Sequence, residues 1–163
     1  MNYLVKMIGS ALLLYAALFI AREYEKFLGK RLRVCLGFCE LLSHVRRRVD
    51  GYLTPADRLL DGFECGALEE VGYISKARSS GLRTAYFEVE EALPLDGTAR
   101  QVISEFFDDF GKDYKEETVK AADRALSALQ GCAERMSCEN EKSLRLLRAV
   151  AVAAALGVII LLI

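Results

Sequence analysis

The hydrophobic positions of this 163-residue chain fall into three regions. From Tyr3 to Ala21 there are nineteen positions with one charge, Lys6, and the chain ends on fifteen uncharged residues after Arg148. Between these runs, apolar residues recur at steps of three and four, which indicates amphipathic helices rather than strands. We therefore predict an all-α protein in three parts, residues 1–21, 22–148 and 149–163.

The two apolar runs suit transmembrane helices. The first nearly matches the roughly 20 residues that a membrane helix needs. Its rival is a cleaved signal peptide, but Phe19 at the -3 position of a cut before Arg22 does not fit the small residue required there. The last fifteen residues span roughly 22 Å, and a start at Leu144 lengthens them to a full crossing if Arg145 and Arg148 reach back to the headgroups. A buried core helix is the alternative for this run.

The basic residues predict the orientation of the chain. Five of them follow the first run closely (Arg22, Lys26, Lys30, Arg31 and Arg33) and only Lys6 lies within it, whereas Arg135, Lys142, Arg145 and Arg148 precede the second run. By the positive-inside rule the middle of the chain lies in the cytoplasm. The odd count of five cysteines agrees, since it fits a reducing compartment better than a disulfide framework.

The charge of the middle region limits the possible partners. All 23 acidic residues and 21 of the 22 basic ones lie between Arg22 and Arg148, so this region carries a net charge of -2. No basic face is evident, and we expect no nucleic acid binding.

The middle region is expected to form a bundle of about six helices, of which the first and last are the longest. A break falls at "DGYLTPADRLL", where Thr54 is a good N-cap and Pro55 suits the first helical position. Further helices are expected at 67–81, at 82–93 and, capped by Thr98 or Asp96, at 99–111, and the last begins near Asp113. Two apolar stripes mark the outer helices: Leu28, Leu32, Cys35, Cys39, Leu42, Val45 and Val49 on the first, and Val119, Ala122, Leu126, Leu129, Ala133, Met136, Asn140, Ser143 and Leu147 on the last.

The second stripe turns polar at Asn140 and Ser143. Either the last helix leaves the bundle there and continues as a stalk, or the two residues form a buried hydrogen-bonded pair.

Residues that carry chemistry are scarce. His44 is the only histidine, and no serine or cysteine motif surrounds it. Cys35 and Cys39 share a helix face but lack two further ligands of a metal motif, and no glycine-rich phosphate loop is present. We expect no catalytic residue, no cofactor and no metal.

Three consecutive arginines, Arg46, Arg47 and Arg48, end the first helix. They complement the helix dipole, and they are also our candidate partner-binding residues, as a docking patch for an acidic partner.

Four segments, in their order, resemble the stage III sporulation protein AB family. They are "MIGSALLLYAALFIA", "GYLTPA", "EFFDDFGKD" and "NEKSLRLLRAVAVAAALGVIILLI". Thr54 and Pro55 match the turn of the family, although Gly51 comes one place earlier and Ala56 replaces a leucine. Asn140, Glu141 and Lys142 match directly, and the membrane-proximal set of the chain is Asn140, Glu141, Lys142, Arg145 and Arg148.

The resemblance implies a non-enzymatic platform component of the channel that joins mother cell and forespore. Its fold would be similar to the cytoplasmic six-helix bundle of the platform protein in type II secretion. It would dock a hexameric secretion-type ATPase, the stage III sporulation protein AA, beside other channel components and as a possible homo-oligomer. The expected location is the outer forespore membrane, with the central domain in the mother-cell cytoplasm. The alternatives are a membrane-bound helical enzyme using His44 or the cysteines, and a secreted helical protein after signal cleavage.

Overall fold

The computed structural model describes residues 2–51, 58–111 and 115–162. Within these ranges, the side chains of residues 2–8, 10, 13, 14, 148, 152, 155, 156 and 158–162 lie outside the description. All regular structure in the described ranges is helical, and they contain no strand, which confirms the predicted all-α class. The Thr54-Pro55 turn and Asp113 fall outside these ranges.

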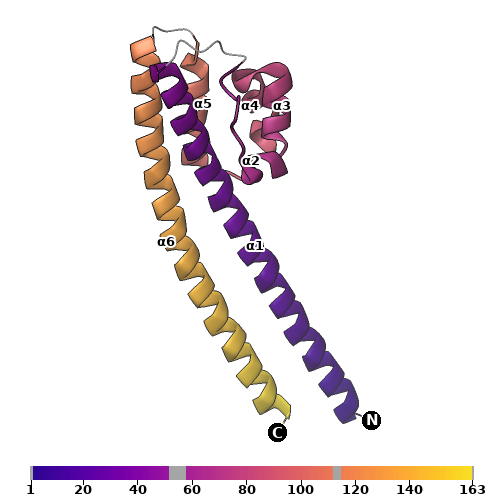
Figure 1. Cartoon of the computed structure of the whole chain (residues 1–163). Helices are drawn as coiled ribbons and strands as arrows, with labels where there is room; N and C mark the ends of the chain where they lie inside the picture. The colour runs from indigo at the N-terminus through magenta and orange to yellow at the C-terminus, as the bar shows by residue number, and fades with distance from the viewer. Residues whose placement is uncertain (1, 52–57, 112–114, 163) are drawn as a thin grey trace. The chain divides into compact units, whose positions relative to one another are not determined.

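The described residues form six α-helices and one short 3₁₀ helix (Figure 1). These are α1 (Asn2–Gly51), α2 (Gly66–Glu70), α3 (Tyr73–Ser80), α4 (Leu82–Val89), η2 (Glu90–Ala92), α5 (Gly97–Asp109) and α6 (Lys115–Leu162). Their contacts divide the chain into two units, residues 1–29 with 137–163, and residues 30–136. We call them the terminal unit and the bundle. Both α1 and α6 continue without a break through the predicted boundaries at residues 21 and 149.

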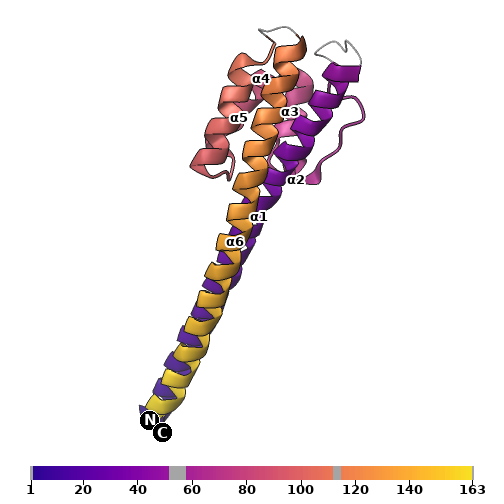
Figure 2. The ribbon, with the colours of Figure 1, turned by 90° about the vertical axis from the view of Figure 1, so that its left-hand side faces the viewer.

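The terminal unit consists of the first part of α1 and the last part of α6, and both ends of the chain lie at the same end of it (Figure 2). Asn140 Nδ2 donates to the backbone oxygen of Leu28 at 3.4 Å. Several large apolar side chains of this unit face away from the protein: Leu12, Tyr15, Leu18, Phe19, Ile20, Leu146 and Val150 are each more than half exposed. Within the part of the chain that the structure describes, no helix has the length and apolar character needed to cross a membrane.

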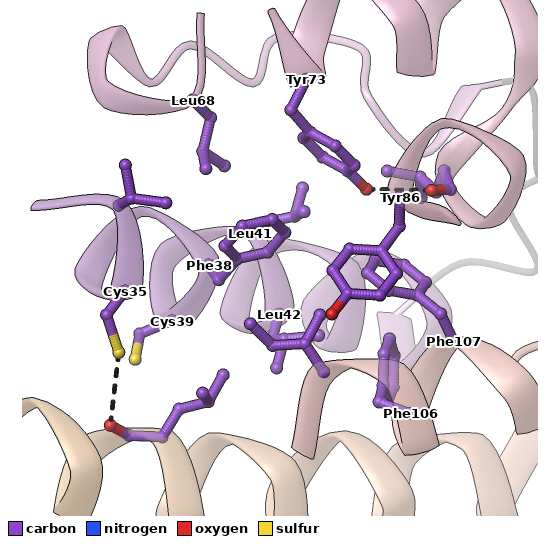
Figure 3. Packing of buried hydrophobic residues seen from close by; sticks show 14 of the residues in the cluster. Cys35, Phe38, Cys39, Leu41, Leu42, Leu68, Tyr73, Tyr86, Phe106 and Phe107 are labelled. Atoms are coloured by element: carbon purple, nitrogen blue, oxygen red, sulfur yellow. Dashed lines mark hydrogen bonds between the residues drawn. The ribbon is translucent and has the colours of Figure 1, made fainter. Parts of the chain in front are cut away.

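In the bundle, α1 is buried on two sides. Figure 3 shows Cys35 and Cys39 directed toward α6, while Phe38 points toward Tyr73 and Tyr86 of the short helices. The predicted stripe of α1 is therefore confirmed but too narrow. It missed Val34, Phe38 and Leu41, which are also fully buried, because a stripe assumes one packed face.

An aromatic cluster fills the centre of the bundle. Tyr86 stacks on Phe107 with ring centroids 5.1 Å apart, and Phe38 lies 5.1 Å from Tyr73. The hydroxyl of Tyr73 donates to the backbone oxygen of Leu82 at 3.1 Å, so its polar tip is satisfied inside the core. Burial raises the pKa of both tyrosines well above the ordinary value, and they stay neutral donors.

Two predicted helices are shorter than expected. The segment 67–81 is not one helix, because Gly72, with φ of 77°, separates α2 from α3. Gly81, with φ of 86°, then separates α3 from α4, and both turns use a left-handed conformation that glycine adopts without a Cβ clash. The predicted helix 82–93 ends at Val89 and continues only as η2.

Of the two predicted caps of α5, only Asp96 occupies the N-cap position. Its side chain makes no cap hydrogen bond. One carboxylate oxygen instead lies 3.5 Å from Arg31 Nη2, where it links the start of α5 to α1. Thr98 lies inside the helix.

The described part of α6 begins at Lys115, close to the predicted start. Its stripe is confirmed at Ala122, Leu129, Ala133 and Met136, which are all buried. Beyond Met136 the helix belongs to the terminal unit.

Asn140 and Ser143 were expected either to mark a stalk or to form a buried pair, and each interpretation holds in part. The helix leaves the bundle before Asn140. Asn140 is nevertheless half-buried and hydrogen-bonded, and its partner is the backbone of Leu28 rather than the side chain of Ser143.

Candidate partner-binding site

The three arginines at the end of α1 point in different directions, because successive helical residues are rotated by about 100°. Arg46 Nε lies 2.5 Å from Asp123 Oδ1, so this side chain ties α1 to α6. Arg48 Nη2 donates to the backbone oxygen of Asp61 at 2.6 Å and holds the chain that enters α2. Two of the three candidate residues thus have contacts within the bundle.

Arg47 is the exposed member of the set. Among the described residues, its side chain makes no hydrogen bond or ion pair, unlike those of Arg46 and Arg48. The docking role of the three arginines stays a prediction.

His44 lies one turn before the arginines and packs against Phe63, with ring centroids 5.2 Å apart. Burial and the neighbouring Arg48 lower its pKa, while a hydrogen bond with the backbone of Leu59 acts in the opposite direction. Its Nε2 is buried and has no hydrogen-bond partner among the described residues. The lowered pKa favours the neutral imidazole, which is half-buried against Phe63.

The cysteines of the α1–α6 contact are also packed. Cys35 Sγ lies 3.8 Å from the backbone oxygen of Leu129, and Cys39 is its neighbour on the same face (Figure 3). The side-chain hydrogen bond with Cys39, together with burial, raises the pKa of Cys35 far above the ordinary value. Among the residues described, no group of three or more His, Cys, Asp or Glu side chains is placed to hold a metal ion. Only Cys138 of the five thiols is exposed.

The residues predicted to be membrane-proximal lie on α6 in the terminal unit. Besides the bond from Asn140 to Leu28, Glu141 Oε2 lies 3.5 Å from Arg145 Nη2, and Lys142 is exposed. The side chain of Arg148 and all of Thr54 and Pro55 lie outside the described residues, so the predicted turn is untested.

Sequence reasoning missed the partners of the arginines. Asp123 and the backbone of Asp61 are distant along the chain from Arg46 and Arg48, and no periodic signal connects them.

These features define an all-α protein whose described central residues pack as a helical bundle. The chain belongs to the stage III sporulation protein AB family, whose model matches residues 6–163. It is thus a member of a sporulation family over nearly its whole length. Neither a curated protein nor a solved structure matches the chain.

Proposed function

We propose that this chain is a membrane-anchored platform component of the channel between mother cell and forespore, where it docks a hexameric secretion-type ATPase. The family supports a role in sporulation. The ATPase is the stage III sporulation protein AA, and the role of the chain itself is non-enzymatic.

The observation that carries the anchoring is the apolar surface of the terminal unit. Tyr15 is 70% exposed, Ile20 is 65% exposed and Leu146 is 68% exposed. Soluble monomers rarely leave large apolar patches exposed to water. Lipid is the medium that covers apolar side chains on every side of a helix pair, and the sequence runs 3–21 and 144–163 have the length for it.

The flanking charges support the orientation. Arg22 and Lys26 follow the first run and Lys142 and Arg145 precede the second, while the bundle lies between them in the chain. This asymmetry favours a bundle in the mother-cell cytoplasm and both termini across the outer forespore membrane.

Docking is proposed at the tip of α1 around Arg47. Arg47 lies on the continuous helix α1, whose backbone is ordered, and its neighbours Arg46 and Arg48 have contacts within the bundle. A charged side chain on a fixed backbone loses less freedom on binding than one on a mobile loop, and arginine is enriched at binding hot spots. The expected partner surface is acidic.

In-cell photocrosslinking tests this proposal. A photoreactive amino acid replaces Arg47 in the full chain, and irradiation of sporulating cells should link it to the ATPase. The matched control is the same replacement at Glu91, an exposed residue of η2. A crosslink at both positions, or at neither position when the chain is present at its normal level, contradicts docking at this tip.

A further inference from the structure

A groove runs between α5 and α6 on the bundle. One hollow of about 270 Å³ has an apolar floor, and a second of about 600 Å³ shares three of its lining residues, Asp109, Ala121 and Arg124. The floor residues are Val102, Phe106, Ala121, Ala125 and Ala128. The two hollows therefore border one another along the pair of helices.

Small side chains form the α6 side of the floor. They are alanines at steps of four and three, while Arg124 lies at the rim, so a second copy can approach closely. Val102 and Ala121 are half-buried and Ala128 is exposed, so apolar surface remains uncovered in the single chain.

At the first hollow the rims of the groove carry opposite charge, since Glu105 and Asp109 line it from α5 and Arg124 lines it from α6. At the second hollow the α6 rim carries charges of both signs, among them Lys120. Arg124 Nε donates only to the backbone oxygen of Lys120, and among the described residues neither of these cations is in an ion pair. The acidic α6 residues at the second hollow are Glu117 and Asp123, and Asp123 is paired with Arg46.

We propose that this groove is the interface between two copies of the chain, related by a two-fold axis that runs along the groove. Such an axis exchanges the two sides of the groove, so the acidic α5 rim of each copy meets the basic α6 rim of the other. An axis across the groove would instead set acid against acid. Charge complementarity thus selects both the occupant and its direction, in an isologous contact.

The proposed axis leaves the two α6 helices parallel. Parallel helices suit two chains whose carboxyl ends enter the same membrane, although the pairing itself does not depend on the proposed anchoring or on the ATPase.

Charge reversal in the purified full-length chain tests the pairing. The mass of the protein in detergent is followed by analytical ultracentrifugation over a dilution series. The wild-type chain should be dimeric at micromolar concentration, and Glu105→Arg and Arg124→Glu should each weaken the dimer by about tenfold or more, because like charges then face each other twice. Glu91→Arg, away from the groove, is the matched control and should leave the mass unchanged.

Mixing the two single variants separates an interface from a folding defect. In the mixed pair, the arginine introduced at position 105 of one chain faces the glutamate introduced at position 124 of the other. The native contact between Arg124 and Glu105 is kept on the opposite side, so heterodimers should form at wild-type concentrations. A variant that merely misfolds is not rescued by mixing.

Disulfide trapping adds a second measurement. In a Cys138→Ser background, mild oxidation of a mixture of Glu105→Cys and Arg124→Cys chains should give a heterodimeric disulfide, whereas a mixture of Glu91→Cys and Arg124→Cys chains should not. A wild-type chain that stays monomeric overturns the proposal. So does a dimer that is insensitive to both charge reversals, as expected if membrane helices alone hold it, or a mixture that shows no rescue.

Discussion

Replacing Gly37 with alanine should destabilise the bundle, although alanine is the better helix former. Gly37 is buried on α1 where it meets the start of α2. An added Cβ would lie 3.0 Å from Cys65 Sγ and 3.0 Å from Leu68 Cγ. Favourable contacts between such atoms lie at about 3.5–4.0 Å, so the two helices must separate or repack.

The magnitude follows from two opposing effects. Helix propensity favours alanine by about 1 kcal/mol, while an extra methyl group in a packed core costs about 1–3 kcal/mol. Gly29→Ala is the matched control, since it lies on the same helix with nothing within 4 Å of the added Cβ. The difference between the two variants isolates the crowding and should be about 1–3 kcal/mol in the free energy of unfolding.

The assay is urea unfolding of the full-length chain in detergent, followed by the near-ultraviolet circular dichroism of the core tyrosines. Adding Cys65→Ala to Gly37→Ala should recover part of the loss, because it removes one of the two close contacts. The reasoning would be refuted if Gly37→Ala stabilised the chain as much as Gly29→Ala does.

Four further outcomes are expected. Burial lowers the pKa of His44 below its ordinary 6.5 in the folded chain, so the unfolded chain binds more protons near this pH. The free energy of unfolding should therefore fall as the pH drops below about 6.5, and His44→Gln should reduce this pH dependence in urea titrations. Tyr73→Phe should cost about 0.5–1.5 kcal/mol in the same assay, since it removes the hydrogen bond from the Tyr73 hydroxyl to the backbone oxygen of Leu82. A double-mutant cycle on Arg46 and Asp123 should give a coupling of at most about 1 kcal/mol, reduced by salt, because both side chains are more than a third exposed. A membrane-impermeant maleimide should label Cys138 only after sporulating cells are permeabilised, and labelling of intact cells would contradict the proposed orientation.

The sequence predicted the long outer helices well, because their apolar periodicity persists over many turns. The positions at Cys35, Leu42, Leu129 and Met136 are buried as expected. The short helices were predicted less well, since Gly72 breaks a segment whose pattern alone reads as one helix. Such breaks depend on where the chain must turn to reach the core, which is a tertiary property.

The candidate partner-binding site at the end of α1 could be predicted from the sequence only as a cluster of three arginines. Three arginines at a helix end are visible in the sequence, but their division into two packed side chains and one exposed side chain depends on Asp123 and Asp61. The groove between α5 and α6 had no sequence signal at all. Its alanines, among them Ala121 and Ala125, lie outside the apolar stripe that was predicted for the last helix.

Titration of the ATPase against the full-length chain in lipid nanodiscs tests the central claim most directly. With and without ATP, the ATPase should bind saturably, Arg47→Glu should weaken the binding, and Glu91→Lys should leave it unchanged. A folded chain that binds no ATPase under either condition would contradict the proposal that this protein docks the ATPase.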